Sequence, residues 1–236
     1  MRGLVIRAVF LDIDDTLLSF SDSVRQIMRA GFERYGLPAY TDEAYRTFQR
    51  VSGGMWRQIE LGELTLTELE RIRWSTIFAE LGISFDGVEF EAYFRRELFS
   101  SAIVVPGAPE LVLYLNGRYV LCAASNGPYG QQINRLRMSS MLDLFDHVFI
   151  SSELGAEKPS AEFFDACFKV LHDSGHPELV PGEAMIVGDS MTSDIAGGAA
   201  YGMQTCLYRP TGSTEPMPSP MADHVVSNLM DVTSFL

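Results

Sequence analysis

Three aspartates within four residues, Asp12, Asp14 and Asp15, follow an apolar run near the N-terminus. The run, residues 8–13, has the length and composition of a buried strand. An unpaired carboxylate is costly to bury inside a strand, so the acids belong where the strand ends and the chain turns. Asp12 and Asp14 can then face one point, where their charges repel each other unless a metal or a lysine neutralises them. The stretch therefore predicts a site for a divalent cation with oxygen ligands, most simply Mg²⁺.

An acidic turn that only closes a strand is the alternative interpretation of this stretch. Similar polar groups at later strand ends favour the site. Ser125 and Asn126 follow the apolar run 119–124, Lys158 lies in a later loop, and Asp189 and Asp194 follow the apolar run 184–187. Because ligands of open parallel sheets bind beyond the carboxyl ends of the strands, these groups are expected to converge.

The order of apolar patterns predicts the fold class. Residues 19–100 show helical spacing without a convincing strand, whereas short apolar runs alternate with helical segments from about residue 104 onward. Alternation of this kind predicts a parallel sheet covered by helices on both faces. We therefore expect an α/β protein with a Rossmann-like, three-layer core of residues 1–18 and 103–236, into which an all-helical domain of residues 19–102 is inserted.

Within the insertion, helices are predicted at residues 21–35, 41–51 and 90–99. Ser52-Gly53-Gly54 is predicted to interrupt the second of these. Thr67 with Glu70 is predicted to form a capping box for a further helix that ends at Gly82. Near the C-terminus, residues 209–221 are rich in Pro, Ser, Thr and Gly and predict a surface loop.

The composition of the chain limits which binding partners and which cellular compartment we expect. A net charge of −13 over 236 residues argues against binding to a nucleic-acid backbone. The three cysteines have no paired spacing and are expected to be buried thiols. The sequence shows no signal peptide and no apolar run long enough to span a membrane, so we expect a soluble, cytoplasmic monomer or homodimer without a membrane partner.

Asp12-Ile13-Asp14-Asp15-Thr16 resembles the first motif, Asp-x-Asp-x-Thr, of the haloacid dehalogenase-like (HAD) hydrolase superfamily. Three later motifs of that family have similar counterparts in this chain. They are Ser125, the segment Glu157-Lys158-Pro159, and the segment 188–194, which begins with Gly-Asp and ends in Asp. The resemblance covers nearly the whole chain and implies that the helical insertion is the cap domain of subfamily I. Asp15 departs from the pattern, because many members have Gly there.

The resemblance also implies the chemistry. Asp12 would be the nucleophile, Asp14 the general acid and base, and Lys158 the cation that steadies the developing charge. Ser125 and Asn126 would bind the phosphoryl group. Mg²⁺ would be held by Asp12, the backbone carbonyl of Asp14 and Asp189, with Asp194 completing the metal site through water or Lys158.

The expected activity is Mg²⁺-dependent hydrolysis of a small phosphorylated metabolite through an aspartyl-phosphate intermediate. A narrower resemblance, in residues 14–20, 62–65, 125–127 and 193–198, is to bacterial pyrimidine 5′-nucleotidases. Trp56, Arg57 and Arg73 are the candidates in the cap for binding the substrate, since Trp can stack on a base and Arg can pair with an anion. The alternatives are a sugar phosphomutase, a 2-haloacid dehalogenase and a binding module without turnover.

Overall fold

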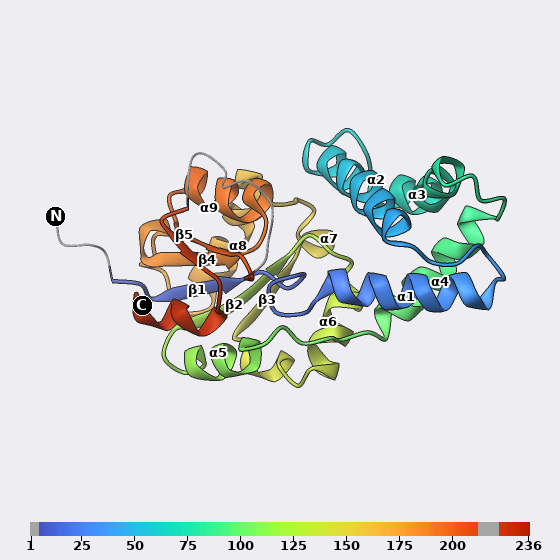
Figure 1. Cartoon of the computed structure of the whole chain (residues 1–236). Helices are drawn as coiled ribbons and strands as arrows, with labels where there is room; N and C mark the ends of the chain where they lie inside the picture. The colour runs from blue at the N-terminus through green and yellow to red at the C-terminus, as the bar shows by residue number, and fades with distance from the viewer. Residues whose placement is uncertain (1–4, 212–221) are drawn as a thin grey trace. The chain divides into compact units, whose positions relative to one another are not determined.

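A computed structural model of the chain describes residues 5–211 and 222–236 (Figure 1). The chain divides into two compact units, Met1–Ser19 with Ala102–Leu236, and Phe20–Ser101. The first unit contains every strand of the sheet, and the second is helical in its described elements. Most of the predicted loop 209–221 lies outside the described residues.

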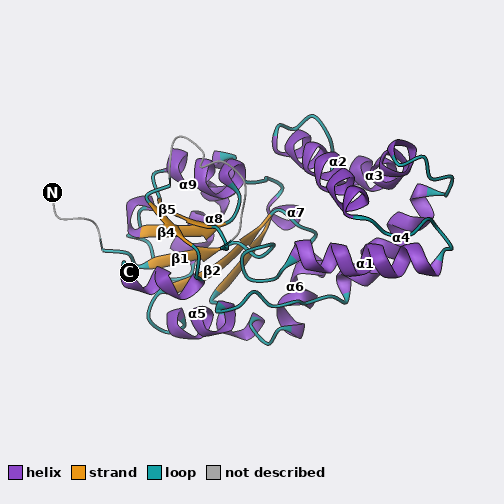
Figure 2. Ribbon diagram, in the orientation of Figure 1, coloured by secondary structure: helices purple, strands orange, loops and turns teal. Residues whose placement is uncertain are grey.

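The first unit is built on a parallel sheet of six described strands in the order β3-β2-β1-β4-β5-β6 (Figure 2). β1 lies between β2 and β4, and the strand order reverses at that point. The carboxyl ends of parallel strands share one edge, and the point of reversal is where ligands of such sheets bind. The strands are β1 Ala8–Leu11, β2 Val120–Ser125, β3 His147–Ile150, β4 Ala184–Gly188, β5 Gln204–Tyr208 and β6 His224–Val226.

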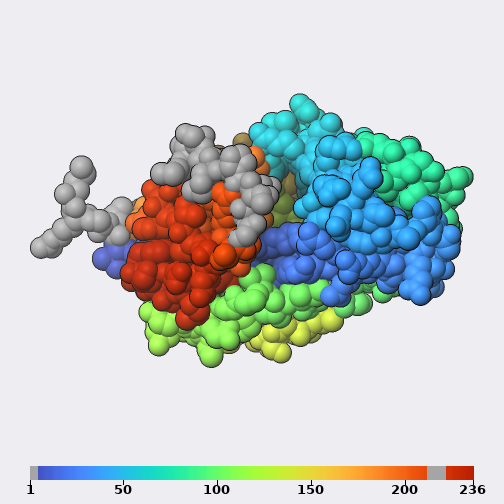
Figure 3. All heavy atoms as spheres, viewed as in Figure 1, coloured from blue at the N-terminus to red at the C-terminus, as the bar shows by residue number. Residues whose placement is uncertain are grey.

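Helices cover both faces of the sheet, as predicted. Val9 and Leu11 point to one face, where they pack with α5 (Ala108–Leu115), α6 (Tyr129–Met138) and the C-terminal 3-10 helix Leu229–Ser234. Figure 3 shows that C-terminal segment, in red, directly against the green spheres of α5. Ala8 and Phe10 point to the other face and pack with α8 (Ala161–Asp173). Side chains that alternate along β1 therefore join two separate apolar layers.

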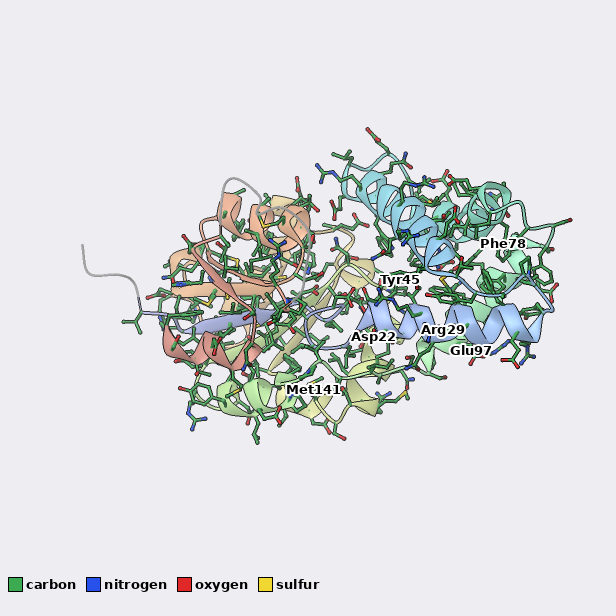
Figure 4. All side chains as sticks on the ribbon, in the orientation of Figure 1. Asp22, Arg29, Tyr45, Phe78, Glu97 and Met141 are labelled. Atoms are coloured by element: carbon green, nitrogen blue, oxygen red, sulfur yellow. The ribbon has the colours of Figure 1, made fainter. Side chains whose placement is uncertain are left out.

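The second unit consists of α1 (Phe20–Arg34), α2 (Asp42–Glu60), α3 (Leu66–Glu80) and α4 (Gly87–Phe99). Its core is aromatic: Trp74 is fully buried, with its ring centroid 4.4 Å from that of Phe90 and 5.3 Å from that of Phe94. Tyr45 and Phe78, both labelled in Figure 4, are buried in the same cluster. Because four helices share this cluster, the unit has a hydrophobic core of its own.

Two predictions within this unit were wrong. α2 continues through Ser52-Gly53-Gly54, because Phe48, Val51, Met55 and Ile59 keep a buried helical face across them. That packing outweighs the cost of two glycines, about 1 kcal/mol each. The capping box is formed by Thr65 and Glu68, one Thr earlier than predicted, while Glu70 pairs with Arg95.

The described cysteines, Cys122, Cys167 and Cys206, are buried and form no disulfide, as predicted. Among residues 5–211 and 222–236, no helix combines the length and the apolar character needed to cross a membrane.

Arg73 is buried inside the helical unit, where its guanidinium makes a two-pronged ion pair with Glu91. The Nε–Oε2 distance is 3.0 Å and the Nη2–Oε1 distance is 2.6 Å. The guanidinium also lies over the ring of Phe94, 4.7 Å from its centroid. With 5% of its surface exposed, Arg73 is a core residue. Its contacts in the structure are those of a structural ion pair, and its role in binding substrate stays a prediction.

We predict that Arg73→Met lowers the free energy of unfolding by about 3 kcal/mol, because it leaves the Glu91 carboxylate buried without its partner. Adding Glu91→Leu should recover most of that loss, since no uncompensated charge remains. Chemical denaturation of both variants measures the effect. Arg95→Met, which breaks the more exposed pair with Glu70, is the matched control and should cost about 1 kcal/mol or less. A double variant as unstable as Arg73→Met would contradict this explanation.

Candidate active site

Lys158 joins the carboxyl ends of three strands. Its ammonium donates hydrogen bonds to the Asp12 carboxylate (2.7 Å), the Asp194 carboxylate (2.6 Å) and the Ala124 carbonyl (2.7 Å). Asp12 directly follows β1, Ala124 lies in β2, and Asp194 follows β4. An ammonium has three N–H donors, and this arrangement uses all of them. The predicted convergence of Asp12, Lys158 and Asp194 is thus present in the structure.

The ammonium remains charged although Lys158 is 1% exposed. Burial lowers the pKa of Lys158, but the charges and hydrogen bonds of Asp12 and Asp194 outweigh burial and raise that pKa above its usual value. The surroundings of Lys158 therefore favour its charged form beside Asp12.

Asp194 is placed by an irregular turn that the sequence did not predict. A π-helical turn, Met191–Ile195, precedes the short helix α9 (Ala196–Tyr201). Within it, the backbone N–H of Ser190 donates to Asp194 Oδ2 over 3.1 Å. A Cβ atom at Gly188 would collide with the same oxygen, so only glycine at the end of β4 admits this carboxylate.

Asp12, Asp189 and Asp194 each offer a carboxylate oxygen, and these oxygens lie within 4.8 Å of one another. Lys158 supplies one positive charge against three carboxylates, which leaves two negative charges uncompensated within the group. Oxygen ligands with this excess of charge fit a hard divalent cation such as Mg²⁺. Asp14, the fourth acid predicted at the metal, is not in this group through its side chain.

Burial, and after it the neighbouring charges, raises the pKa values of Asp12 and Asp189. Burial raises the pKa of the Asp12 carboxyl to about 7; Lys158 opposes this rise, and the charges of Asp194 and Asp14 reinforce it. Desolvation and the charges of Asp12 and Asp194 raise the pKa of Asp189 well above its usual value. A bound cation would favour the ionised form of both groups.

Asp14 faces a different cation. Arg135 Nη1 donates to Asp14 Oδ1, and Gln132 Nε2 donates to Asp14 Oδ2 over 2.5 Å. Both donors come from α6 and both are 0% exposed. The same Gln132 amide donates to Ser125 Oγ over 2.7 Å, which links Asp14 to the end of β2.

Sequence reasoning missed Gln132 and Arg135. The signal was present: two polar residues spaced by three lie on the turns of α6 that also carry the buried Leu136. A buried arginine needs a carboxylate partner, and the acids at the end of β1 were the available candidates.

Asn126 is used differently from the prediction. Its amide donates to the Lys158 carbonyl and accepts from the Lys158 backbone N–H, both over 2.8 Å. This reciprocal pair fixes the loop that carries the ammonium. Asn126 is therefore placed as a support for Lys158, and its role in binding phosphate stays a prediction.

The departure of Asp15 from the family pattern has a backbone explanation. Asp15 has a φ of 57°, in the left-handed region that glycine adopts most easily. Aspartate is among the few other residues that visit this region routinely. The turn after Asp14 is closed by the Asp15 N–H, which donates to the Leu18 carbonyl over 2.8 Å. The backbone at Asp15 therefore has a conformation that glycine could also adopt.

The remaining predicted residues belong to the helical unit. Trp56 is half-buried against the aromatic cluster. Arg57 is exposed and pairs with Glu60, at an Nη1–Oε2 distance of 2.9 Å. These contacts lie within the helical unit and do not identify either residue as a ligand-binding residue.

The chain belongs to the haloacid dehalogenase-like hydrolases, whose family model matches residues 6–202. It is therefore a hydrolase of this family. It is 31% identical over 204 residues to YfnB of Bacillus subtilis, named as a HAD-hydrolase, covering 86% of this chain and 84% of that protein. It is 30% identical to the pyrimidine 5′-nucleotidase YjjG of Escherichia coli, over 84% of each chain. The crystal structure of YfnB, described as bound to magnesium, superposes with a TM-score of 0.85 at 29% identity and covers 98% of both chains.

We predict that Asp12→Asn stabilises the metal-free protein above neutral pH. The folded-state pKa of Asp12, about 7, exceeds the unfolded value of roughly 3.9. The free energy of unfolding must therefore fall as pH rises through that window, because ionisation is easier in the unfolded chain. The asparagine side chain does not ionise, so the variant should melt roughly 5 °C or more above wild type at alkaline pH in EDTA, and the difference should shrink toward pH values of about 4.

Thermal denaturation across pH measures this difference, and Asp173→Asn at an exposed position is the control. A difference that is constant with pH would show that charge on Asp12 is not its cause.

Proposed function

We propose that this hydrolase cleaves phosphate monoesters of small metabolites in a Mg²⁺-dependent reaction, with Asp12 as the nucleophile. One observation carries the proposal: Asp12 and Asp14 are two residues apart, yet they are held by different cations, Lys158 and Arg135. Two carboxylates in different environments can take different chemical roles, which a two-step transfer requires.

In the first step, an Asp12 oxygen attacks phosphorus, and the bond from phosphorus to the ester oxygen breaks. Asp14 gives its proton to the departing oxygen, so an alcohol leaves and an aspartyl-phosphate remains. In the second step, Asp14 takes a proton from water, whose oxygen attacks phosphorus. Phosphate is released, and Asp12 returns to its carboxylate form.

The surrounding groups supply electrostatic support. Lys158 favours the ionised form of Asp12 and offsets charge on the transferring group, while the Ser125 hydroxyl hydrogen-bonds a phosphoryl oxygen. Asp12, Asp189 and the backbone carbonyl of Asp14, with Asp194 beside them, would hold Mg²⁺. When bound, that cation reduces the repulsion between an anionic nucleophile and an anionic substrate.

A dehalogenase is a weaker candidate on the same geometry. A halide leaves without a proton, so the first step of that reaction has no use for a general acid. Asp14 is held by two buried donors beside Asp12. The two donors that hold the Asp14 carboxylate in place support a reaction in which the leaving group must be protonated.

Nucleoside 5′-monophosphates are the first substrate class to test, because YjjG and the pneumococcal PynA, 28% identical over 86% of this chain, are named pyrimidine 5′-nucleotidases. The experiment measures phosphate release with Mg²⁺ from nucleotides, sugar phosphates and phosphoglycolate. A preference for nucleotides supports a nucleotidase, and sugar-phosphate isomerisation without release would instead indicate a mutase. Trp56→Ala and Arg57→Ala test whether the helical unit selects the substrate.

We predict that Asp12→Asn reduces phosphate release to background while the protein remains folded, because the amide cannot form the aspartyl-phosphate. Steady-state kinetics and circular dichroism on the same preparation measure both properties. Turnover near the wild-type rate would remove Asp12 from the role of nucleophile.

We predict that EDTA stops turnover and that Asp189→Asn raises the Mg²⁺ concentration for half-maximal rate by on the order of 100-fold, through loss of an anionic ligand. The rise in melting temperature on adding Mg²⁺ should shrink in the same variant. Asp173→Asn should behave as wild type. Full activity of Asp189→Asn in EDTA would contradict the metal requirement.

A further inference from the structure

Gln132 and Arg135 connect the two sides of the site through one chain of hydrogen bonds. Arg135 Nη1 donates to Asp14 Oδ1 and, over 3.0 Å, to Gln132 Oε1. Gln132 Nε2 in turn donates to Asp14 Oδ2 and to Ser125 Oγ. The chain therefore runs from the end of β1, through α6, to the end of β2.

We propose that Gln132 and Arg135 are positioning residues for proton transfer: they fix Asp14 as the proton donor and acceptor, and they orient the Ser125 hydroxyl as a donor to the phosphoryl group. This inference rests on the proposed function and adds to it two residues that contact Asp14 and Ser125 and act through them.

The orientation of the Gln132 amide is determined by its neighbours. Its oxygen faces the Arg135 guanidinium, which only donates, and its nitrogen faces the Asp14 carboxylate, which accepts. Turning the amide over would place oxygen against carboxylate and N–H against guanidinium. Both N–H bonds of the amide are consequently directed, one to Asp14 and one to Ser125.

This orientation sets the direction of the Ser125 hydroxyl. Ser125 Oγ accepts from Gln132 Nε2 over 2.7 Å and from the Gly127 backbone N–H over 3.1 Å. A hydroxyl has two acceptor lone pairs and one O–H donor. With both lone pairs used, the remaining capacity of Ser125 is to donate, which is what an anionic phosphoryl oxygen requires.

The contacts also restrain Asp14. Each carboxylate oxygen accepts one bond from α6, so rotation of the carboxylate would break one or both. Asp14 keeps 31% of its side chain exposed, whereas Arg135 has none. A partly exposed carboxylate can still exchange a proton with a leaving group or water.

Gly127 makes space for the bridge. A Cβ atom there would lie 2.5 Å from Gln132 Nε2, so any larger residue must displace the amide. Gly127→Ala consequently perturbs the positioning of Asp14 and Ser125 without removing a polar group.

The test compares two substrates on Gln132→Leu, Arg135→Met and Gly127→Ala. One substrate is an alkyl phosphate that the wild type hydrolyses, whose leaving oxygen needs a proton. The other is p-nitrophenyl phosphate, whose phenolate leaves without one. We expect kcat/KM for the alkyl phosphate to fall about 100-fold more than for p-nitrophenyl phosphate, the scale of lost general-acid catalysis. Because both values come from one preparation, their ratio is unaffected by any misfolded fraction.

A second readout follows the later step. With p-nitrophenyl phosphate, the variants should show a burst of nitrophenol of about one per active site, because a misplaced Asp14 slows hydrolysis of the aspartyl-phosphate. Arg137→Met, on the exposed side of the same helix, is the matched control and should change neither readout. Equal losses on both substrates without a burst, or no loss, would overturn the proposal.

A crystal structure of Gln132→Leu tests the position of the Asp14 carboxylate independently of turnover. The Asp14 carboxylate should leave its wild-type position, and an unchanged carboxylate would overturn the proposal. Failure of the proposed function would look different: the wild type itself would release no phosphate from any monoester, whatever the position of Asp14 in the variant.

Discussion

The buried ammonium of Lys158 is the interaction on which the site depends. It can lose its water only because three oxygens, from the ends of β1 and β2 and the turn after β4, replace that water at hydrogen-bonding distance. Parallel strands deliver those oxygens to one edge of the sheet. Conversely, Asp12 and Asp194 can lie together in a buried place because the ammonium lies between them. Neither the cation nor the two anions would be tolerable there alone.

Two cations divide the acids of the site into separate groups. Lys158 holds Asp12 and Asp194, while Arg135 holds Asp14. If one cation served both Asp12 and Asp14, the two carboxylates would share the same partner and the same surroundings. Their separation follows from topology, since Lys158 precedes α8 and Arg135 lies in α6, on opposite faces of the sheet. The three-layer fold thus gives two acids of one loop different cation partners.

The sequence predicted the features of the fold and the site that follow from local patterns along the chain. The parallel sheet followed from alternating apolar runs, and the convergence of Asp12, Lys158 and Asp194 followed from their positions after strands. The continuity of α2 through Gly53 and Gly54 depends on packing against other helices, which local propensity does not contain. Arg73 gave no sign that its partner, Glu91, lay on the next helix. The roles of Gln132 and Arg135 depend on which face of α6 meets the loop after β1, and only tertiary structure decides that.

The site also depends on two glycines, because neither has a side chain that would collide with its neighbours. Gly188 and Gly127 lie at the end of β4 and just after β2, and a Cβ at either would collide with Asp194 Oδ2 or Gln132 Nε2. Both side chains contact a charged group of the site: Asp194 holds Lys158, and Gln132 holds Asp14. The geometry of the site is therefore set by the backbone at the strand ends as well as by the charged residues themselves. A chain that kept every acid and base of the motifs, but had alanine at these glycines, would carry the same functional groups in positions unsuited to the reaction.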